Sequence, residues 1–342
     1  MKLNERIDAL VQLGEHLQGE DEYLQAIMHR THFNNAWFTK ENQQNAVQSI
    51  ARHFLSREQL QQWVSRYDIP EQTDAQTIGL VMAGNIPLVG FHDWLCIFVA
   101  GHRAQVKLSE KDQFLFPYLM KILERIDGRT TDYTELTNQL KGFDAVIATG
   151  SNNSARYFEA YFGKYPHIIR RNRHGVAVLT GDENKVELQA LGQDIFQYYG
   201  LGCRNVAKLY VPEGYDFDPL LEALHEYREI VLNNKYKNNF DYNYALFVLN
   251  KKPFKANGCV LLVEDPALQS RIACLHYEHY RERTQVEADL NERETEIQCV
   301  VAQEGALQRK TYHFGQAQKP ALWDYADGED TLAFLLRLGS KP

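Results

Sequence analysis

The sequence predicts an α/β protein in which a helical N-terminal region precedes two units built on parallel sheets. From about residue 76 onward, short apolar runs alternate with stretches of helical periodicity. That alternation is typical of βαβ units, which form parallel sheets. The first seventy residues instead repeat apolar side chains at helical spacing, as in Leu3, Ile7 and Leu10. At 342 residues, the chain has the length of about two domains.

The individual elements follow from these patterns in chain order. The expected strands are 77–83, 104–108, 143–149, 176–179, 205–211, 244–249, 259–263 and 297–301. Helices are expected between them, including one capped by Ser109 and one over 186–199. The Asn- and Tyr-rich stretch 233–244 is predicted to be a long loop. The expected parts of the chain are 1–75, 76–180, 181–305 and 306–342.

Composition excludes several classes of protein. Asp and Glu number 45 against 37 Lys and Arg, for a net charge of −8, whereas a general nucleic-acid binder needs a basic face. No apolar run approaches the roughly 20 residues that span a bilayer, and the N-terminus does not resemble a signal peptide. The five cysteines are scattered and odd in number, which favours a reducing compartment over disulfides. We therefore expect a soluble cytoplasmic protein.

Common cofactor and metal motifs are absent from the sequence. No G-x-G-x-x-G follows an expected strand, and no G-x-x-x-x-G-K-[ST] phosphate loop occurs. His276 and His279 lie three apart on a predicted helix, but no third ligand accompanies them and H-E-x-x-H is not matched. No metal site is therefore expected.

Cys203 is the strongest candidate for a reactive side chain. It lies in Tyr199-Gly200-Leu201-Gly202-Cys203-Arg204-Asn205, between a predicted helix and a predicted strand. The neighbouring Arg204 would stabilise a thiolate, which is the nucleophilic form of cysteine. The alternative is a small buried apolar side chain, the ordinary fate of cysteine. We expect that fate for Cys96, Cys259, Cys274 and Cys299, which lie inside apolar runs.

Two turns that follow expected strands also carry candidate residues. Asn85, in Gly84-Asn85-Ile86-Pro87, offers a neutral amide that can stabilise a developing oxyanion. Ser151, after Thr149-Gly150, lies at a helix N-terminus, where backbone N–H groups attract phosphate. Each also has an ordinary explanation, Asn85 as a turn residue and Ser151 as a helix cap.

Taken in order, these motifs resemble the aldehyde dehydrogenase superfamily. Its members carry Trp-Asn-x-Pro, Ala-Gly-Asn…Lys-Pro-Ser-Glu, Phe-Thr-Gly-Ser, Gly-Gln-x-Cys and Glu-Ile-Phe-Gly. The similar segments here are Gly84-Asn85-Ile86-Pro87, Ala100-Gly101-His102…Lys107-Leu108-Ser109-Glu110, Ala148-Thr149-Gly150-Ser151, Gly200-Leu201-Gly202-Cys203 and Thr295-Glu296-Ile297-Gln298. Their order and spacing are compatible over residues 76–302. The resemblance implies two Rossmann-like domains, a nucleotide-binding one over 76–180 and a catalytic one over 181–305.

Within that superfamily, the sequence is most similar to the LuxC-type fatty acyl-CoA reductases. The similar segments are Gly-Asn-Ile-Pro, Lys-Leu-Ser, Gly-Cys-Arg-Asn-Val and the C-terminal Phe314-Gly315-Gln316-Ala317-Gln318…Leu322-Trp323-Asp324-Tyr325-Ala326-Asp327-Gly328. One departure from the superfamily is informative. Acid-forming members carry a Glu in Glu-Leu-Gly-Gly about thirty residues before the nucleophile, whereas this chain has Arg170-Arg171-Asn172-Arg173-His174-Gly175. Without that base, hydrolysis of an acyl-enzyme should be slow, which favours reduction; His174 would be the alternative base.

The resemblance implies an acyl-CoA reductase that makes an aldehyde with NADPH or NADH, with CoA as the leaving group. Cys203 would be the nucleophile and Asn85 an oxyanion donor. The implied cofactor-binding residues are Lys107, Ser109, Glu110, Gly150, Ser151 and Glu296. Glu110 would repel a 2′-phosphate, which favours NADH, whereas LuxC-type enzymes are associated with NADPH.

Several alternatives stay open at this stage. An aldehyde or semialdehyde dehydrogenase, a non-catalytic nucleotide-binding relative and a cysteine hydrolase would share many of these features. The cluster Arg170, Arg171 and Arg173 is either a solvated basic face or a contact for CoA phosphates. A homo-oligomer and a synthetase partner that supplies the acyl group are both compatible with the sequence.

Overall fold

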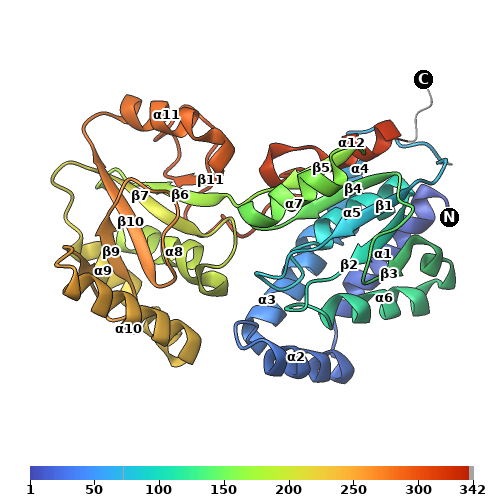
Figure 1. The fold of residues 1–342 in the computed structure, drawn as a ribbon, viewed down its shortest axis with the longest axis horizontal. Coiled ribbons are helices and arrows are strands. Elements are labelled where there is room, and N and C mark those ends of the chain that lie inside the picture. The colour runs from blue at the N-terminus through green and yellow to red at the C-terminus, as the bar shows by residue number, and fades with distance from the viewer. Residues whose placement is uncertain (72, 339–342) are drawn as a thin grey trace. The chain divides into compact units, whose positions relative to one another are not determined.

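The computed structural model describes residues 1–71 and 73–338. The chain forms two compact units, Met1–Asn172 with the segment from Pro320, and Arg173–Lys319 (Figure 1). These limits differ from the expected parts at two points. The first unit ends at 172 rather than near 180, because strand β6 (His174–Val178) pairs into the second sheet. The C-terminal segment 306–342 divides at 319, because its two halves pack on different units.

The sheet of the first unit is fully parallel, with the strand order β3-β2-β1-β4-β5. Its strands are β1 (Thr77–Val81), β2 (Arg103–Lys107), β3 (Thr134–Leu136), β4 (Ala145–Thr149) and β5 (His167–Arg170). The direction of winding reverses at β1, which lies between β2 and β4. Ligands of open α/β sheets bind at the carboxyl ends of the strands beside such a reversal.

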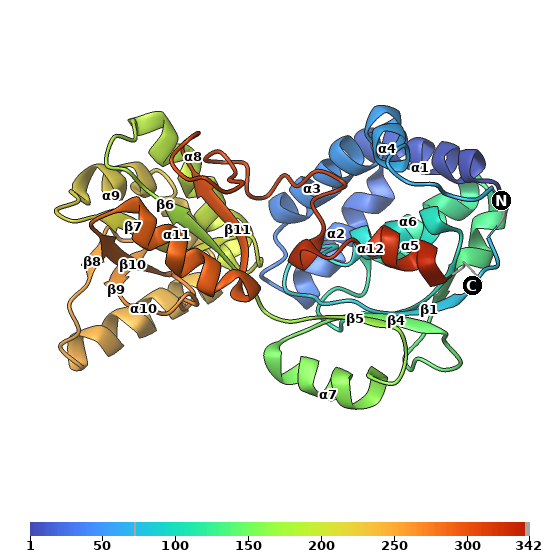
Figure 2. The ribbon, with the colours of Figure 1, turned by 90° about the horizontal axis from the view of Figure 1, so that it is seen from above.

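Helices cover both faces of this sheet. Figure 2 shows α7 on one side and α5, α6 and α12 on the other. The predicted N-terminal helical region is confirmed. The helices of this unit are α1 (Leu3–Gln18), α2 (Glu22–Asn34), α3 (Lys40–Ser49), α4 (Arg57–Val64), α5 (Phe91–Ala100), α6 (Leu115–Ile126), α7 (Asn152–Phe162) and α12 (Thr331–Leu338). Helix α6 begins at Leu115, so Ser109 does not cap it as predicted.

The C-terminal motif returns to the first unit and joins the N-terminal helices. The hydroxyl of Tyr325 accepts a hydrogen bond from the Trp63 indole at 2.7 Å and lies 2.7 Å from the Tyr67 hydroxyl. Tyr67 in turn donates to Asp330 at 2.8 Å. Because buried polar groups are costly unless paired, this network makes the motif a structural connection within the unit.

The second sheet has the order β11-β6-β7-β10-β9-β8 and is parallel except for β8. Its further strands are β7 (Val206–Pro212), β8 (Lys255–Ala256), β9 (Leu261–Glu264), β10 (Cys274–Tyr280) and β11 (Ile297–Ala302). Its helices are α8 (Lys185–Phe196), α9 (Asp218–His225), α10 (Asn234–Leu249) and α11 (Arg283–Glu292). Short 3₁₀ turns lie at Gly128–Tyr133, Gln197–Gly200, Arg228–Leu232, Glu294–Glu296 and Ala326–Gly328, and a π turn lies at Ile50–Phe54. The predicted α/β class with two parallel sheets is therefore confirmed.

Three local predictions in the second unit were wrong. The expected loop 233–244 and strand 244–249 form one helix, α10, which Asn233 caps. Its buried residues Tyr236, Phe240, Asn243 and Phe247 recur at helical spacing, and their packing outweighs the poor helix propensity of Asn and Tyr. The stretch 276–279 is strand rather than helix, so His276 and His279 do not share a helical face.

Within residues 1–71 and 73–338, every helix is too short or too polar to cross a bilayer. In that part of the chain, no three His, Cys, Asp or Glu side chains gather as metal ligands would.

Candidate active site

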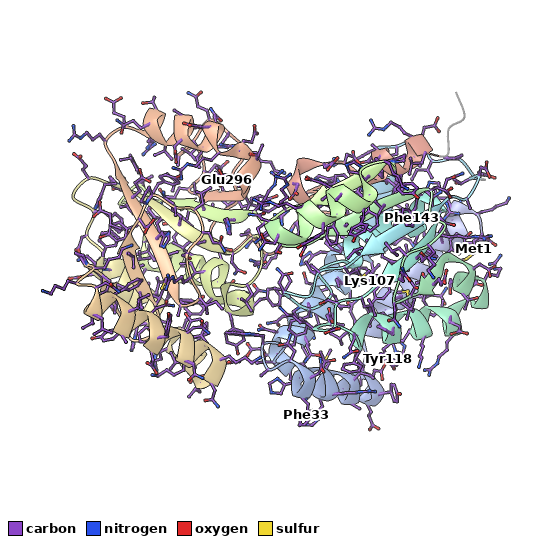
Figure 3. The ribbon with its side chains drawn as sticks, in the orientation of Figure 1. Met1, Phe33, Lys107, Tyr118, Phe143 and Glu296 are labelled. Carbon is purple, nitrogen blue, oxygen red and sulfur yellow. The ribbon has the colours of Figure 1, made fainter. Side chains whose placement is uncertain are left out.

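In the first unit, three turns with predicted site residues lie at the carboxyl ends of adjacent strands. Asn85 follows β1, Lys107 ends β2 with Ser109 and Glu110 just after it, and Gly150 and Ser151 follow β4. Because β2, β1 and β4 are neighbours and parallel, these turns share one edge of the sheet. Figure 3 labels Lys107 where β2 ends. The sheet therefore brings these candidates together beside the reversal at β1.

The turn that carries Asn85 is tightly constrained. A Cβ on Gly84 would lie 2.4 Å from the Ser109 Oγ, so only glycine lets the two turns approach this closely. Leu88 has a φ of +57°, a strained left-handed conformation for a residue with a side chain. Its N–H donates to the Asp112 carboxylate at 2.7 Å. Asp112 therefore fixes the backbone that presents Asn85.

Burial raises the pKa of Asp112 to about 6, although the Leu88 N–H opposes that rise. The folded protein thus binds this proton more tightly than the unfolded chain, whose aspartates titrate near about pH 4. The resulting stabilisation is complete below about pH 4 and is lost as the pH rises through about 6. Two pKa units correspond to about 3 kcal/mol.

We expect Asp112→Asn to remove this pH dependence while keeping an acceptor for Leu88. Near about pH 7 its unfolding free energy should lie within about 1 kcal/mol of wild type. Removal of a buried charge is favourable, and it offsets the cost of burying the N–H groups of the new amide. Asp112→Ala leaves the Leu88 N–H without its acceptor and should cost about 1–3 kcal/mol. Denaturant unfolding between about pH 4 and pH 8 measures both effects. An alanine variant as stable as the asparagine variant would contradict this role.

The cofactor candidates of this edge have the chemistry that a dinucleotide needs. Lys107 and Glu110 are exposed and Ser109 is half-buried. Asn34 and Asn35 donate to the carbonyls of Glu110 and Lys111 at 3.2 and 3.3 Å, which holds that turn. These side chains offer a cation, a hydroxyl and a carboxylate to a ribose and its phosphate.

The turn between β4 and α7 lies at the same edge of the sheet and is suited to bind the phosphates of a dinucleotide. Ser151 caps α7 by accepting from the Ser154 N–H at 3.2 Å, and α7 directs its other N-terminal N–H groups outward. A Cβ on Gly150 would meet the Ser154 Cβ at 2.8 Å, so glycine allows the strand to turn directly into the helix. The residues present therefore fit a dinucleotide.

In the second unit, three candidates lie at the amino ends of neighbouring strands. Cys203 precedes β7, His174 begins β6, and Glu296 directly precedes β11, beside which Figure 3 labels it. The strand order β11-β6-β7 makes them neighbours, and His174 pairs in register with Ile297. A Cβ on Gly175 would lie 2.7 Å from the carbonyl oxygens of Arg204 and Asn205. Only glycine therefore lets β6 approach the cysteine loop so closely.

The loop that presents Cys203 is held by one buried side chain. Asn205 accepts from the Gly202 N–H at 2.8 Å and donates to the carbonyls of Asp194 and Gln197 at 3.0 and 2.9 Å. Just before the loop, Tyr198, Tyr199 and Gly200 all have left-handed φ values, between +53° and +72°. Such strain persists only where the surrounding structure compensates for it, and it is common at active sites.

Cys203 differs in its environment from the other cysteines. It is half-buried, whereas Cys96, Cys259, Cys274 and Cys299 are buried, as predicted for those four. Burial lowers the pKa of Arg204, but nearby Cys299, Tyr312 and Cys203 outweigh that effect and raise it. Arg204 thus holds a positive charge near the Cys203 sulfur.

His174 is the alternative base that the sequence resemblance implied. Burial lowers its pKa, although the charge of Glu296 opposes that effect. The imidazole is therefore neutral near about pH 7.

The predicted basic cluster does not form one surface. Arg170 is buried, and its guanidinium donates to Asp93 at 2.5 Å and to Thr331 at 2.7 Å. Arg171 pairs with Glu159, and Arg173 donates to backbone carbonyls. Arg170 is thus neither a solvated side chain nor accessible to a phosphate, because β5, which the sequence did not reveal, carries it into the core.

Sequence reasoning also missed two buried carboxylates near the candidate turns. Asp112 and Asp194 were not singled out, although each is nearly fully buried. The available signal was an aspartate three residues from an apolar helix residue, as Asp112 is from Leu115 and Asp194 from Leu191. That signal is too common to be specific.

No protein-family model matches the chain, and no curated protein matches it in sequence. Solved structures do match. An NAD-dependent aldehyde dehydrogenase from Sinorhizobium meliloti is 11% identical, with a TM-score of 0.67 over 88% of this chain and 70% of that one. An NADP-dependent enzyme from E. coli is 14% identical, with a TM-score of 0.63 over 88% and 73%. An acetylating aldehyde dehydrogenase from Geobacillus thermoglucosidasius is 11% identical, with a TM-score of 0.62 over 94% and 86%. The chain therefore has the fold of the aldehyde dehydrogenases.

Proposed function

We propose that this protein is a nicotinamide-dependent acyl-CoA reductase that converts an acyl thioester, preferably a fatty acyl-CoA, to the aldehyde. The observation that carries the proposal is the environment of Cys203. Its thiol is half-buried on a loop held by Asn205, with the Arg204 charge beside it. A thiolate of this kind is suited to attack a carbonyl carbon.

The acyl transfer step follows from that thiolate. The Cys203 sulfur attacks the thioester carbonyl and forms a new C–S bond, and the carbonyl electrons move to oxygen. The Cys203 backbone N–H and the Asn85 amide stabilise this oxyanion. Collapse of the tetrahedral species breaks the bond to the CoA sulfur, so CoA leaves as its thiolate and the acyl group stays on Cys203.

The second step requires a hydride at the acyl carbon. A reduced nicotinamide supplies that hydride when bound. Lys107, Ser109 and Glu110 would hold the adenosine ribose, Gly150 and Ser151 the phosphates, and Glu296 the nicotinamide ribose. Glu110 disfavours a 2′-phosphate, whereas the resemblance to LuxC-type enzymes favours NADPH, so both NADH and NADPH are proposed as cofactors. The resulting thiohemiacetal on Cys203 breaks its C–S bond to release the aldehyde.

Oxidation of an aldehyde or semialdehyde is the second candidate function. It is favoured by the neutral His174, which begins the strand beside the Cys203 loop and could activate water against an acyl-enzyme. The two functions differ in the fate of the acyl group. Reduction consumes acyl-CoA and reduced nicotinamide, whereas oxidation consumes aldehyde and oxidised nicotinamide.

A substrate panel separates these functions. Purified protein is incubated with acyl-CoAs of increasing chain length and either NADH or NADPH, and aldehyde, CoA thiol and nicotinamide oxidation are measured together. We expect the three to change in a 1:1:1 ratio, with aldehyde oxidation at least about tenfold slower. CoA release without nicotinamide oxidation would identify a hydrolase, and no turnover of acyl-CoA or aldehyde would reject an enzyme of this class.

A further inference from the structure

In the second unit, a segment that follows β11 lies near the loop that carries Cys203. We call Tyr312–Ala317 the return segment. Its backbone pairs with β11, since the Tyr312 N–H donates to Val300 at 2.8 Å and the Ala302 N–H donates to Tyr312 at 3.0 Å. The segment includes most of the Phe314–Gln318 motif, for which the proposed reaction gives no role.

Asp194 of α8 binds the return segment directly. The side chain is 1% exposed, and its carboxylate accepts the N–H groups of Gly315 at 2.6 Å and Ala317 at 3.0 Å. Gly315 has a φ of +78°, and a Cβ there would lie 3.2 Å from the Ala190 Cβ. Position 315 is therefore restricted to glycine by conformation and by space.

The same residue is connected to the cysteine loop. The Asp194 carbonyl accepts from the Asn205 amide at 3.0 Å, and Asn205 in turn holds the Gly202 N–H. A second connection runs through Arg204, whose guanidinium lies 5.4 Å from the centre of the Tyr312 ring. The return segment thus contacts both the support of the loop and the charge beside the thiol.

We propose that the return segment positions the Cys203 loop and that Asp194 is the positioning residue through which it does so. The proposal rests on Cys203 being the nucleophile of the proposed function. Without the two bonds to Asp194, Tyr312 shifts relative to Arg204, and the loop loses a fixed support. Cys203 then loses both its orientation and part of its stabilising charge.

The charged and titratable groups that face Asp194 come from three elements. They are Lys319 just after the return segment, Tyr227 after α9, and Cys299 on β11. Burial raises the pKa of Asp194 to about 6, against the lowering effects of the Gly315 and Ala317 N–H groups and of Lys319. Above about pH 6 the carboxylate is ionised and accepts both bonds.

The test is the reactivity of Cys203 toward iodoacetamide as a function of pH, followed by mass spectrometry of the Cys203 peptide in the full-length protein. In Asp194→Asn, the amide oxygen still accepts one hydrogen bond, but the amide NH2 group cannot accept the other. One of the bonds from the Gly315 and Ala317 N–H groups is therefore lost. Gly315→Ala keeps the carboxylate but displaces the segment. The control, Asp182→Asn, removes the same charge from an exposed position of the same unit.

We expect both test variants to raise the apparent pKa of the Cys203 thiol by roughly one unit and to lower kcat roughly tenfold to a hundredfold. KM should stay within about twofold, and the control should match wild type. Folded Asp194→Asn and Gly315→Ala proteins with wild-type alkylation curves and kcat would overturn the proposal. If Asp194→Asn does not fold, the alkylation curve and kcat of Gly315→Ala alone test the proposal. If wild type turns over no acyl-CoA, the proposed function fails, and the alkylation curves still test the positioning.

Discussion

Cys203→Ala removes acyl-CoA reduction while the protein stays folded. We expect the rate to fall by at least about 10⁴-fold, because no other side chain of the second unit can form the acyl thioester. The other four cysteines are buried, and burial raises the pKa of Cys259 to about 11 and those of Cys274 and Cys299 to about 12. Burial also holds the pKa of Cys96 well above its ordinary value. None of these thiols forms a thiolate at neutral pH.

The measurement is CoA release and nicotinamide oxidation with the best acyl-CoA of the panel. Mass spectrometry without nicotinamide adds a direct readout, because wild type should gain one acyl mass and the variant none. Cys274→Ala is the matched control, since it removes a buried thiol from β10 and should keep nearly full activity. An acylated or active Cys203→Ala protein would assign the nucleophile to another residue.

Asn85→Ala lowers kcat by about 10²- to 10³-fold and leaves KM within about threefold. The reason is that an amide donor stabilises the oxyanion only when charge develops in the transition state. The side chain is exposed, and the turn that carries it is held by other contacts, namely Gly84 against Ser109 and Leu88 bonded to Asp112. The substitution should therefore leave the turn intact.

Asn85→Asp is the informative comparison. It has the same shape, but its negative charge opposes the oxyanion, so its kcat should be lower than that of the alanine variant. Steady-state kinetics together with nucleotide affinity from fluorescence titration measure both variants. Unchanged nucleotide affinity with a reduced kcat supports a role of Asn85 in the chemical step. An equal kcat for wild type and Asn85→Ala excludes that role.

The candidate site illustrates which features a local pattern can reveal. Asn85, Gly150 and Cys203 each stand where an element changes type, beside glycines, and such turns are visible in the sequence. That Asn85 and Gly150 share one edge of the first sheet depends on strand order, which periodicity does not report. The expected strand 176–179 falls in the part 76–180, although the observed β6 pairs with β7 and β11 of the second sheet.

Other features were not predictable because their causes are distant in the chain. Arg170 is buried because Asp93 and Thr331, 77 and 161 residues away, supply its partners. Helix α10 forms despite the poor helix propensity of its Asn and Tyr residues, because buried aromatic residues pack on one of its faces. The carboxylate of Asp194 is buried because backbone N–H groups 121 and 123 residues later bind it.

Apolar periodicity and short-range turn chemistry are local properties, and they were sufficient to predict the α/β class, the helical N-terminal region and the burial of four cysteines. The three-dimensional structure was needed to show which strands are neighbours, which charged groups are buried and what holds each turn in place. Those properties depend on hydrogen bonds between segments far apart in the chain, and no local pattern records the partner.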